Sequence, residues 1–64
     1  MKRQYTYHTA TTFDGPKPPE VDHNKYGHFS VVPDWVRHIR YWAFEEEAGR
    51  DLFSLDYAQW IVQP

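Results

Sequence analysis

Polar and apolar residues alternate along residues 5–13, a stretch rich in threonine and tyrosine. In an extended chain, Tyr5, Tyr7 and Phe13 fall on one side, because successive side chains point to opposite faces. β-Branched and aromatic residues are also enriched in strands. The pattern predicts a strand over residues 5–13, and its shortage of aliphatic side chains predicts that one face is exposed to water.

The next segment, residues 14–27, contains three prolines and two glycines. Proline fixes φ and lacks a backbone N–H, so we expect no regular element here. Connections longer than about 12 residues are uncommon in small domains and tend to be functional or mobile. Residues 28–32 then predict a short second strand, and Pro33 is expected to end its ladder.

A helix is predicted over residues 35–48. At 100° per residue, five apolar side chains fall on one stripe, which is typical of a helix that covers a core. Asp34 is a good N-cap, and Gly49 suits the residue after the last turn. We expect Trp35, Ile39 and Trp42 to pack against the sheet; the full stripe is Trp35, Val36, Ile39, Trp42 and Ala43.

The C-terminal segment admits two interpretations. As a helix it would bring Phe53, Tyr57, Trp60 and Ile61 to one side, whereas its β-branched and aromatic residues favour a strand over residues 57–62. With the strand, the order becomes ββαβ: a single α+β domain over residues 1–64. We expect a three-stranded mixed sheet, with its last two strands parallel through a right-handed crossover, and one amphipathic helix on one face.

Composition explains how so short a chain can fold. A domain of 64 residues buries only roughly 60% of the surface that its unfolded chain exposes. Twelve of its side chains are Phe, Trp or Tyr, and each such ring can remove on the order of 150–250 Å² from water. The chain has no cysteine, which fits a reducing compartment. The N-terminus lacks the apolar segment of a signal peptide, and no apolar run could cross a bilayer, so we expect a cytoplasmic protein.

Few residues suggest catalysis or a cofactor. Ser30 and Ser54 lack a nucleophile-elbow context, and the glutamates at 45–47 point in different directions on the predicted helix. The four histidines do not form the close ligand pairs that zinc sites use. We therefore expect no enzyme activity, no metal and no cofactor.

The surplus rings of the predicted helix suggest binding. Arg37, Arg40, Tyr41 and Phe44 lie off its apolar stripe, and Tyr and Arg are enriched among residues that dominate protein interfaces. These four residues are the predicted partner-binding site. Two alternatives stay open for the same residues: the rings could pack beneath the long loop, or the basic and aromatic side chains could hold single-stranded nucleic acid. The net charge of −2 argues against nucleic acid, which favours basic surfaces. A homodimer formed through exposed sheet edges or faces is a further alternative.

In size, absence of cysteine and expected ββαβ order, the chain resembles small phage-encoded proteins that bind and redirect host machinery. A strand ending in Val-Pro, followed by a helix and a last strand, is similar to the layout of phage inhibitors of bacterial RNA polymerase. The resemblance implies a non-enzymatic inhibitor or modulator that covers a surface of a host protein. It transfers no functional residues, because it rests on layout alone.

Overall fold

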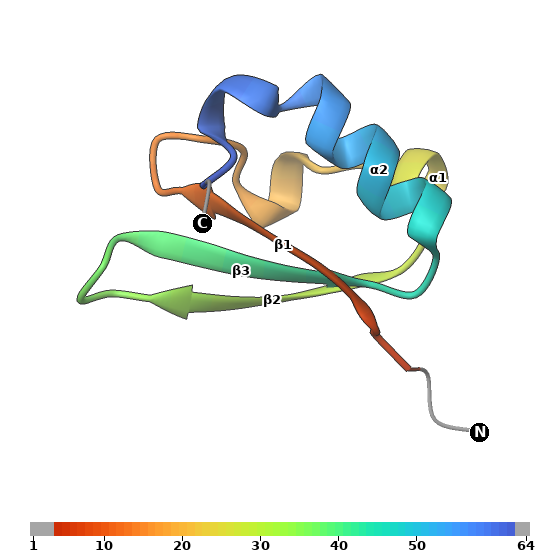
Figure 1. The fold of residues 1–64 in the computed structure, drawn as a ribbon, viewed down its shortest axis with the longest axis horizontal. Helices are drawn as coiled ribbons and strands as arrows, with labels where there is room; N and C mark the ends of the chain where they lie inside the picture. The colour runs from red at the N-terminus through yellow and green to blue at the C-terminus, as the bar shows by residue number, and fades with distance from the viewer. Residues whose placement is uncertain (1–3, 63–64) are drawn as a thin grey trace.

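The computed structural model describes residues 4–62 as a three-stranded antiparallel sheet with two helices on one side (Figure 1). A small α+β domain with three strands and one main helix is thus confirmed. The elements are β1 (Tyr7–Thr12), α1 (His23–Tyr26), β2 (Phe29–Asp34), β3 (Ile39–Phe44) and α2 (Glu47–Asp56), with 3₁₀ turns at Pro18–Glu20 and Ala58–Trp60.

The sheet differs from the expected one in its connections. Its strand order is β1-β3-β2, and both pairings are antiparallel. The sheet is therefore not mixed, and the predicted parallel crossover is wrong. Strands β2 and β3 form a hairpin, and α2 follows all three strands instead of lying between two of them.

The predicted helix over residues 35–48 is wrong, because residues 35–38 form a turn and Ile39–Phe44 is β3. The Asp34 carboxylate does accept hydrogen bonds from the backbone N–H groups of Val36 and Arg37, both at 3.1 Å. Such bonds begin a turn as readily as a helix. The apolar positions also fit a period of two, with Trp42 on one face of the strand and Tyr41 on the other.

Pro33 lies inside β2 instead of ending it. The Glu45 N–H donates to the carbonyl oxygen of His28 at 3.1 Å. His28 and every second residue after it therefore turn their backbone groups toward β3. Because these groups alternate along an antiparallel pair, Pro33 turns its nitrogen toward the free edge. No ladder hydrogen bond is lost there, so the proline is compatible with an edge strand.

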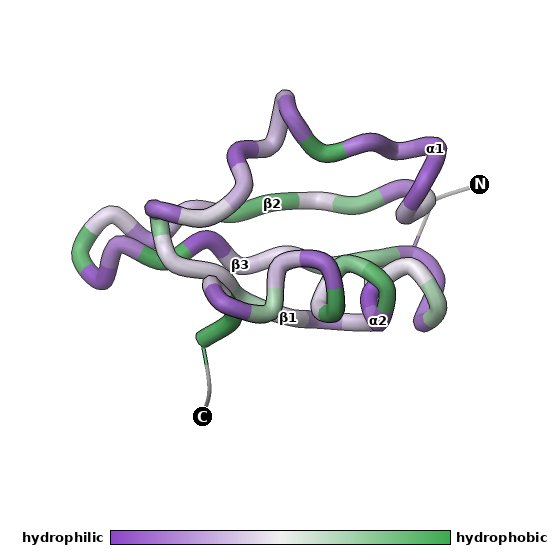
Figure 2. Tube along the Cα trace, turned by 90° about the horizontal axis from the view of Figure 1, so that it is seen from above, coloured by the Kyte–Doolittle hydropathy of each residue, from purple (hydrophilic) through white to green (hydrophobic). Residues whose placement is uncertain are grey.

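Residues 14–27 are more ordered than the prolines suggest. The Asp22 carboxylate accepts from the N–H of Asn24 at 2.8 Å and caps the single-turn helix α1. This segment also places Val21 and Tyr26 in the core, where they are almost fully buried. Seen from above, the segment runs alongside β2 while α2 lies over β1 and β3 (Figure 2). Together they cover one face of the sheet.

The predicted C-terminal strand over residues 57–62 is wrong for most of its length. A 3₁₀ turn spans Ala58–Trp60, and only then does Ile61 form an isolated antiparallel bridge with Thr11. The helix that does form, α2, begins at Glu47, next to the C-terminal end of the predicted helix. Gly49 is buried inside α2, and a Cβ there would lie 2.9 Å from the carbonyl carbon of Tyr26 and closer still to its oxygen. The glycine therefore permits close packing of α1 on α2.

The core is a cluster of rings. Phe53 of α2 lies between Trp42 and Phe44 of β3, with ring centroids 4.7 and 5.1 Å away. Trp42 also donates from its indole nitrogen to the hydroxyl of Thr11 at 2.8 Å, and both groups are buried. The core role predicted for Trp42 is confirmed. The role predicted for Trp35 is wrong, because this side chain is exposed, and Ile39 is only partly buried.

Candidate binding surface

The four predicted partner-binding residues do not form one surface. Arg37 lies in the turn between β2 and β3, Tyr41 points from β3 to the uncovered face of the sheet, and Phe44 is fully buried in the core. Phe44 therefore cannot contact a partner, and its assignment is wrong. Residues four apart in a strand are separated by roughly 13 Å. Arg40 and Phe44 would be neighbours on a helix, but they lie apart along β3.

Two strongly exposed apolar side chains, Trp35 and Val36, are adjacent in the turn of residues 35–38, which we call the hairpin tip. Trp35 is 70% exposed and Val36 is 92% exposed. The tip is the closed end of the β2–β3 hairpin, at the left of Figure 1, whereas α1 and the start of α2 lie at the right. Large apolar side chains so placed contribute nothing to the core.

The backbone of the hairpin tip is held in one conformation. Besides the two bonds accepted by Asp34, the Phe13 N–H donates to the carbonyl oxygen of His38 at 3.0 Å, which ties the turn to the end of β1. His38 has a φ of 58°, a left-handed conformation that closes the turn and is uncommon outside glycine. Strain of this kind persists only where surrounding contacts fix the residue.

The side chain of Phe13 packs against two side chains of the hairpin tip. Its ring lies 5.1 Å from that of Trp35 in an edge-on arrangement and 5.5 Å from that of His38 in a stacked one. The guanidinium of Arg40 lies 4.7 Å from the same ring and donates to the carbonyl oxygen of Phe13 at 3.2 Å. Arg40 is therefore a supporting residue of the tip, although it was predicted to contact a partner directly.

The face of the sheet opposite the helices is uncovered within the described residues (Figure 1). Val32 of β2 and Tyr41 of β3 are directly paired there and are 60% and 41% exposed. Ala10 of β1 pairs with Tyr41 from the other side. This apolar row crosses the three strands, and Tyr41 is the one predicted site residue that belongs to it.

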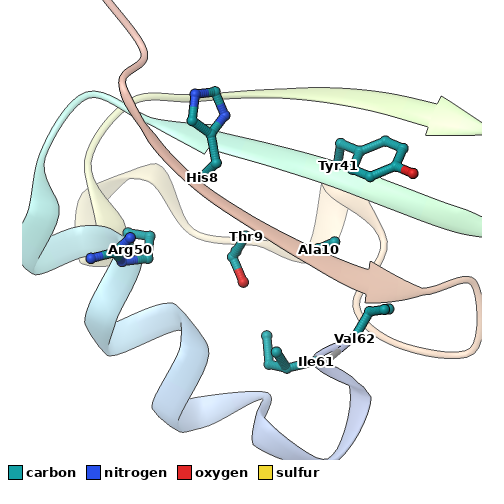
Figure 3. Close-up of a pocket in the computed structure, with 7 residues that line it drawn as sticks. All are labelled: His8, Thr9, Ala10, Tyr41, Arg50, Ile61 and Val62. Atoms are coloured by element: carbon teal, nitrogen blue, oxygen red, sulfur yellow. The ribbon is translucent and has the colours of Figure 1, made fainter. Parts of the chain in front are cut away.

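A groove of about 510 Å³ follows the outer edge of β1. His8 and Tyr41 line it on the uncovered side of the sheet, whereas Arg50 of α2 and Ile61 line it on the helix side (Figure 3). Thr9, Ala10 and Val62 complete the lining. The groove thus has walls on both faces of an edge strand.

The groups with shifted pKa values lie elsewhere and hold the helices together. Asp56 accepts hydrogen bonds from Lys25 at 2.8 Å and from the hydroxyl of Tyr26 at 2.7 Å. These bonds, first that from Lys25 and then that from Tyr26, lower the pKa of the Asp56 carboxyl. Burial, and then the bond to Asp56, raise the pKa of the Tyr26 hydroxyl. The three groups join α1 to the end of α2.

Histidine 23 has a packing role as well. Its ring stacks on that of Phe29 at 4.0 Å and lies 6.0 Å from that of His28. Over residues 4–62, no group of three or more His, Cys, Asp or Glu side chains is arranged to hold a metal ion. The helices of this same part of the chain are all too short and polar to cross a bilayer.

Comparison with known proteins found no matching protein family, curated protein or solved structure. What the sequence reasoning missed is the hairpin tip, whose residues Trp35 and Val36 were assigned to a core. The available signal was the Asp34 side chain between two runs of β-branched and aromatic residues, since aspartate initiates turns by bonding the backbone that follows.

Proposed function

We propose that the protein is a non-enzymatic binding protein that covers part of a partner protein's surface, with the hairpin tip as its principal contact. The observation that carries this proposal is the exposure of Trp35 and Val36 on a turn with a fixed backbone. Trp35 and Val36 are adjacent, and apolar side chains exposed next to one another mark interaction sites more often than single exposed side chains do.

The chemistry of the hairpin tip suits a protein partner. Tryptophan and arginine are the residues that most often dominate interface energetics, and Trp35 and Arg37 are two positions apart here. The contacts of Trp35 and His38 with Phe13 restrict the turn before binding. A pre-organised anchor loses less conformational entropy when it binds. These features support insertion of the tip into an apolar pocket.

The charge of Arg37 at the hairpin tip predicts an acidic residue at the rim of that pocket. The Arg37 side chain is 71% exposed, and its nearest carboxylate oxygen, on Asp34, is 3.8 Å away. An exposed ion pair of this length contributes little, so Arg37 can exchange it for a partner's carboxylate. Tyr41 and Val32 on the uncovered sheet face offer a secondary apolar contact.

The partner was expected to be a host protein, and the protein phage-encoded, because of the chain's size, its lack of cysteine and a ββαβ layout. The observed order is three strands followed by α2, so that layout gives the proposal no support. That the partner is a host protein stays a prediction, which the capture experiment below can test.

Paired variants test the proposal. We expect a protein captured from lysate by the wild type to be lost when Trp35→Ala or Val36→Ser is the bait. Leu55→Ala is the matched control, because Leu55 is also exposed, at 75%, but lies on α2. Thermal melts of all three variants should resemble that of the wild type. Retention of the partner by both tip variants, or its loss from the Leu55 variant alone, would refute the assignment of the tip.

Nucleic acid is the second candidate, favoured by the combination of Trp35 with Arg37 at the hairpin tip. Aromatic rings that stack on bases, together with cations, hold single strands, and such binding weakens steeply with salt. Fluorescence anisotropy with a labelled oligonucleotide over a salt series separates the two candidates. A homodimer through the free edge of β2 is less favoured, since Pro33 lies on that edge.

A further inference from the structure

The outer edge of β1 already pairs with another segment at one of its ends. Ile61 forms an antiparallel bridge with Thr11, and the Val62 N–H donates to the carbonyl oxygen of Ala10 at 2.9 Å. This pairing follows two 3₁₀ hydrogen bonds that bring the chain back to the sheet. The edge of β1 is therefore geometrically able to accept an added strand.

The backbone of His8 continues that edge. The hydrogen bond from the Phe13 N–H to the carbonyl oxygen of His38 shows that the backbone groups of Phe13 face β3. Every second residue before it in β1 does the same, because backbone groups alternate along an antiparallel pair. The N–H and C=O groups of His8 consequently point outward, in line with those of Ala10. His8 lies two residues before Ala10, whose carbonyl oxygen accepts the hydrogen bond from Val62. The backbone groups of His8 face away from β3 and can bond to the backbone of a neighbouring strand.

Side chains on both sides of this edge form the groove of about 510 Å³ (Figure 3). A strand laid along β1 would direct alternate side chains to the two faces of the sheet. One set would meet Ala10 and Tyr41 on the uncovered face. The other set would enter the space between β1 and α2, where Thr9 and Arg50 lie. Such an arrangement, an edge strand beside a helix, suits peptide recognition by strand addition.

Arg50 determines the charge that this groove accepts. Its guanidinium lies 5.9 Å from the ring of Tyr7, which holds the cation beside β1. Its partners Glu47, at 3.7 Å, and Asp51, at 2.7 Å, are exposed carboxylates on the same helix. The carboxylates of Glu47 and Asp51 are 64% and 62% exposed, whereas Arg50 is 29% exposed. An incoming carboxylate can therefore replace one of these two at the guanidinium.

We propose that the edge of β1 binds an extended segment of a partner protein, which adds a fourth strand beside His8 and places an acidic side chain against Arg50. Apolar side chains of that segment pack on Ala10 and Tyr41. This site is separate from the hairpin tip, and either proposal can fail without the other.

A defined peptide tests the proposal. The probe is an acetylated and amidated hexapeptide of alternating valine and glutamate, titrated into ¹⁵N-labelled protein. We expect the amide resonance of His8 to shift and its hydrogen exchange to slow. Arg50→Gln should weaken binding about five- to tenfold, Arg50→Lys less, because a lysine keeps the charge but not the bidentate geometry. Arg37→Gln is the matched control and should bind the peptide as the wild type does.

Several outcomes would overturn the proposal. A peptide of alternating valine and lysine that binds equally well would remove the role of Arg50. Protection of the His8 amide without peptide in dilute protein would mean that the edge is already paired, and protection that grows with protein concentration would assign it to a second copy of this chain. Shifts confined to Trp35 and its neighbours would place the peptide on the hairpin tip instead.

Discussion

Replacing Gly49 by alanine sets helix propensity against packing. In an exposed helix, the change from glycine to alanine stabilises by about 1 kcal/mol. Gly49 is instead buried, and an added Cβ would lie 2.9 Å from the carbonyl carbon of Tyr26 and closer to its oxygen. Because both partners are backbone, the methyl group cannot be accommodated by a change of rotamer. Helix α1 would have to move away from α2.

The cost of that movement can be bounded from the contacts it disturbs. Overpacking a well-packed interior costs about 1–3 kcal/mol, and a backbone clash belongs at the upper end of that range. Moving Tyr26 also weakens its hydrogen bond to Asp56, 2.7 Å long, and its edge-on contact with Phe53, at 5.6 Å. After the propensity gain is subtracted, we expect a net loss of about 2 kcal/mol, and a melting temperature lower by about 8–16 °C for a domain of this size.

Thermal and urea denaturation followed by circular dichroism measure this loss. Ala48→Gly is the control, because Ala48 precedes Gly49 in α2 but is exposed. It should cost about 1 kcal/mol from propensity alone. If Gly49→Ala melts at or above the wild type, the close approach of α1 to α2 is wrong.

Three further predictions concern the core and the pH dependence of stability. Trp42→Ala should destabilise by about 3–5 kcal/mol and leave so small a domain largely unfolded, as seen by urea denaturation; a melt close to the wild type would contradict its burial. Thr11→Val should cost about 1–3 kcal/mol, because the buried indole N–H of Trp42 loses its acceptor, and Thr11→Ser should restore most of that loss. The pKa of Asp56 is lowered, so its contribution to stability is present above the usual value of 3.8 and is lost as the pH falls through the lowered value. Asp56→Asn should therefore reduce the fall of the melting temperature at acid pH, measured over a series of pH values. An unchanged fall would exclude the role of Asp56.

Alternation and composition along the chain were enough to predict part of the fold. The strand over residues 5–13 was predicted because its threonines and rings alternate over several residues, and β1 lies within it. The burial of Trp42 and the small α+β domain were also predicted correctly. The burial of Trp42 follows from the need of a short chain without cysteine to bury its largest rings.

The fold of residues 34–62 depends on contacts between segments that are distant in the sequence. Both a helix and a β-hairpin satisfy the apolar positions from Trp35 to Phe44, and the Asp34 carboxylate can begin either. Their local propensities differ by less than about 1 kcal/mol per residue. Packing of Phe53 favours the hairpin over the helix. Its ring packs on Trp42 and Phe44 only when these two side chains project from one face of a strand. That packing buried Phe44, left Trp35 on the hairpin tip, and turned Gly49 from an apparent helix end into the contact between two helices, because close packing across the core outweighs local preference.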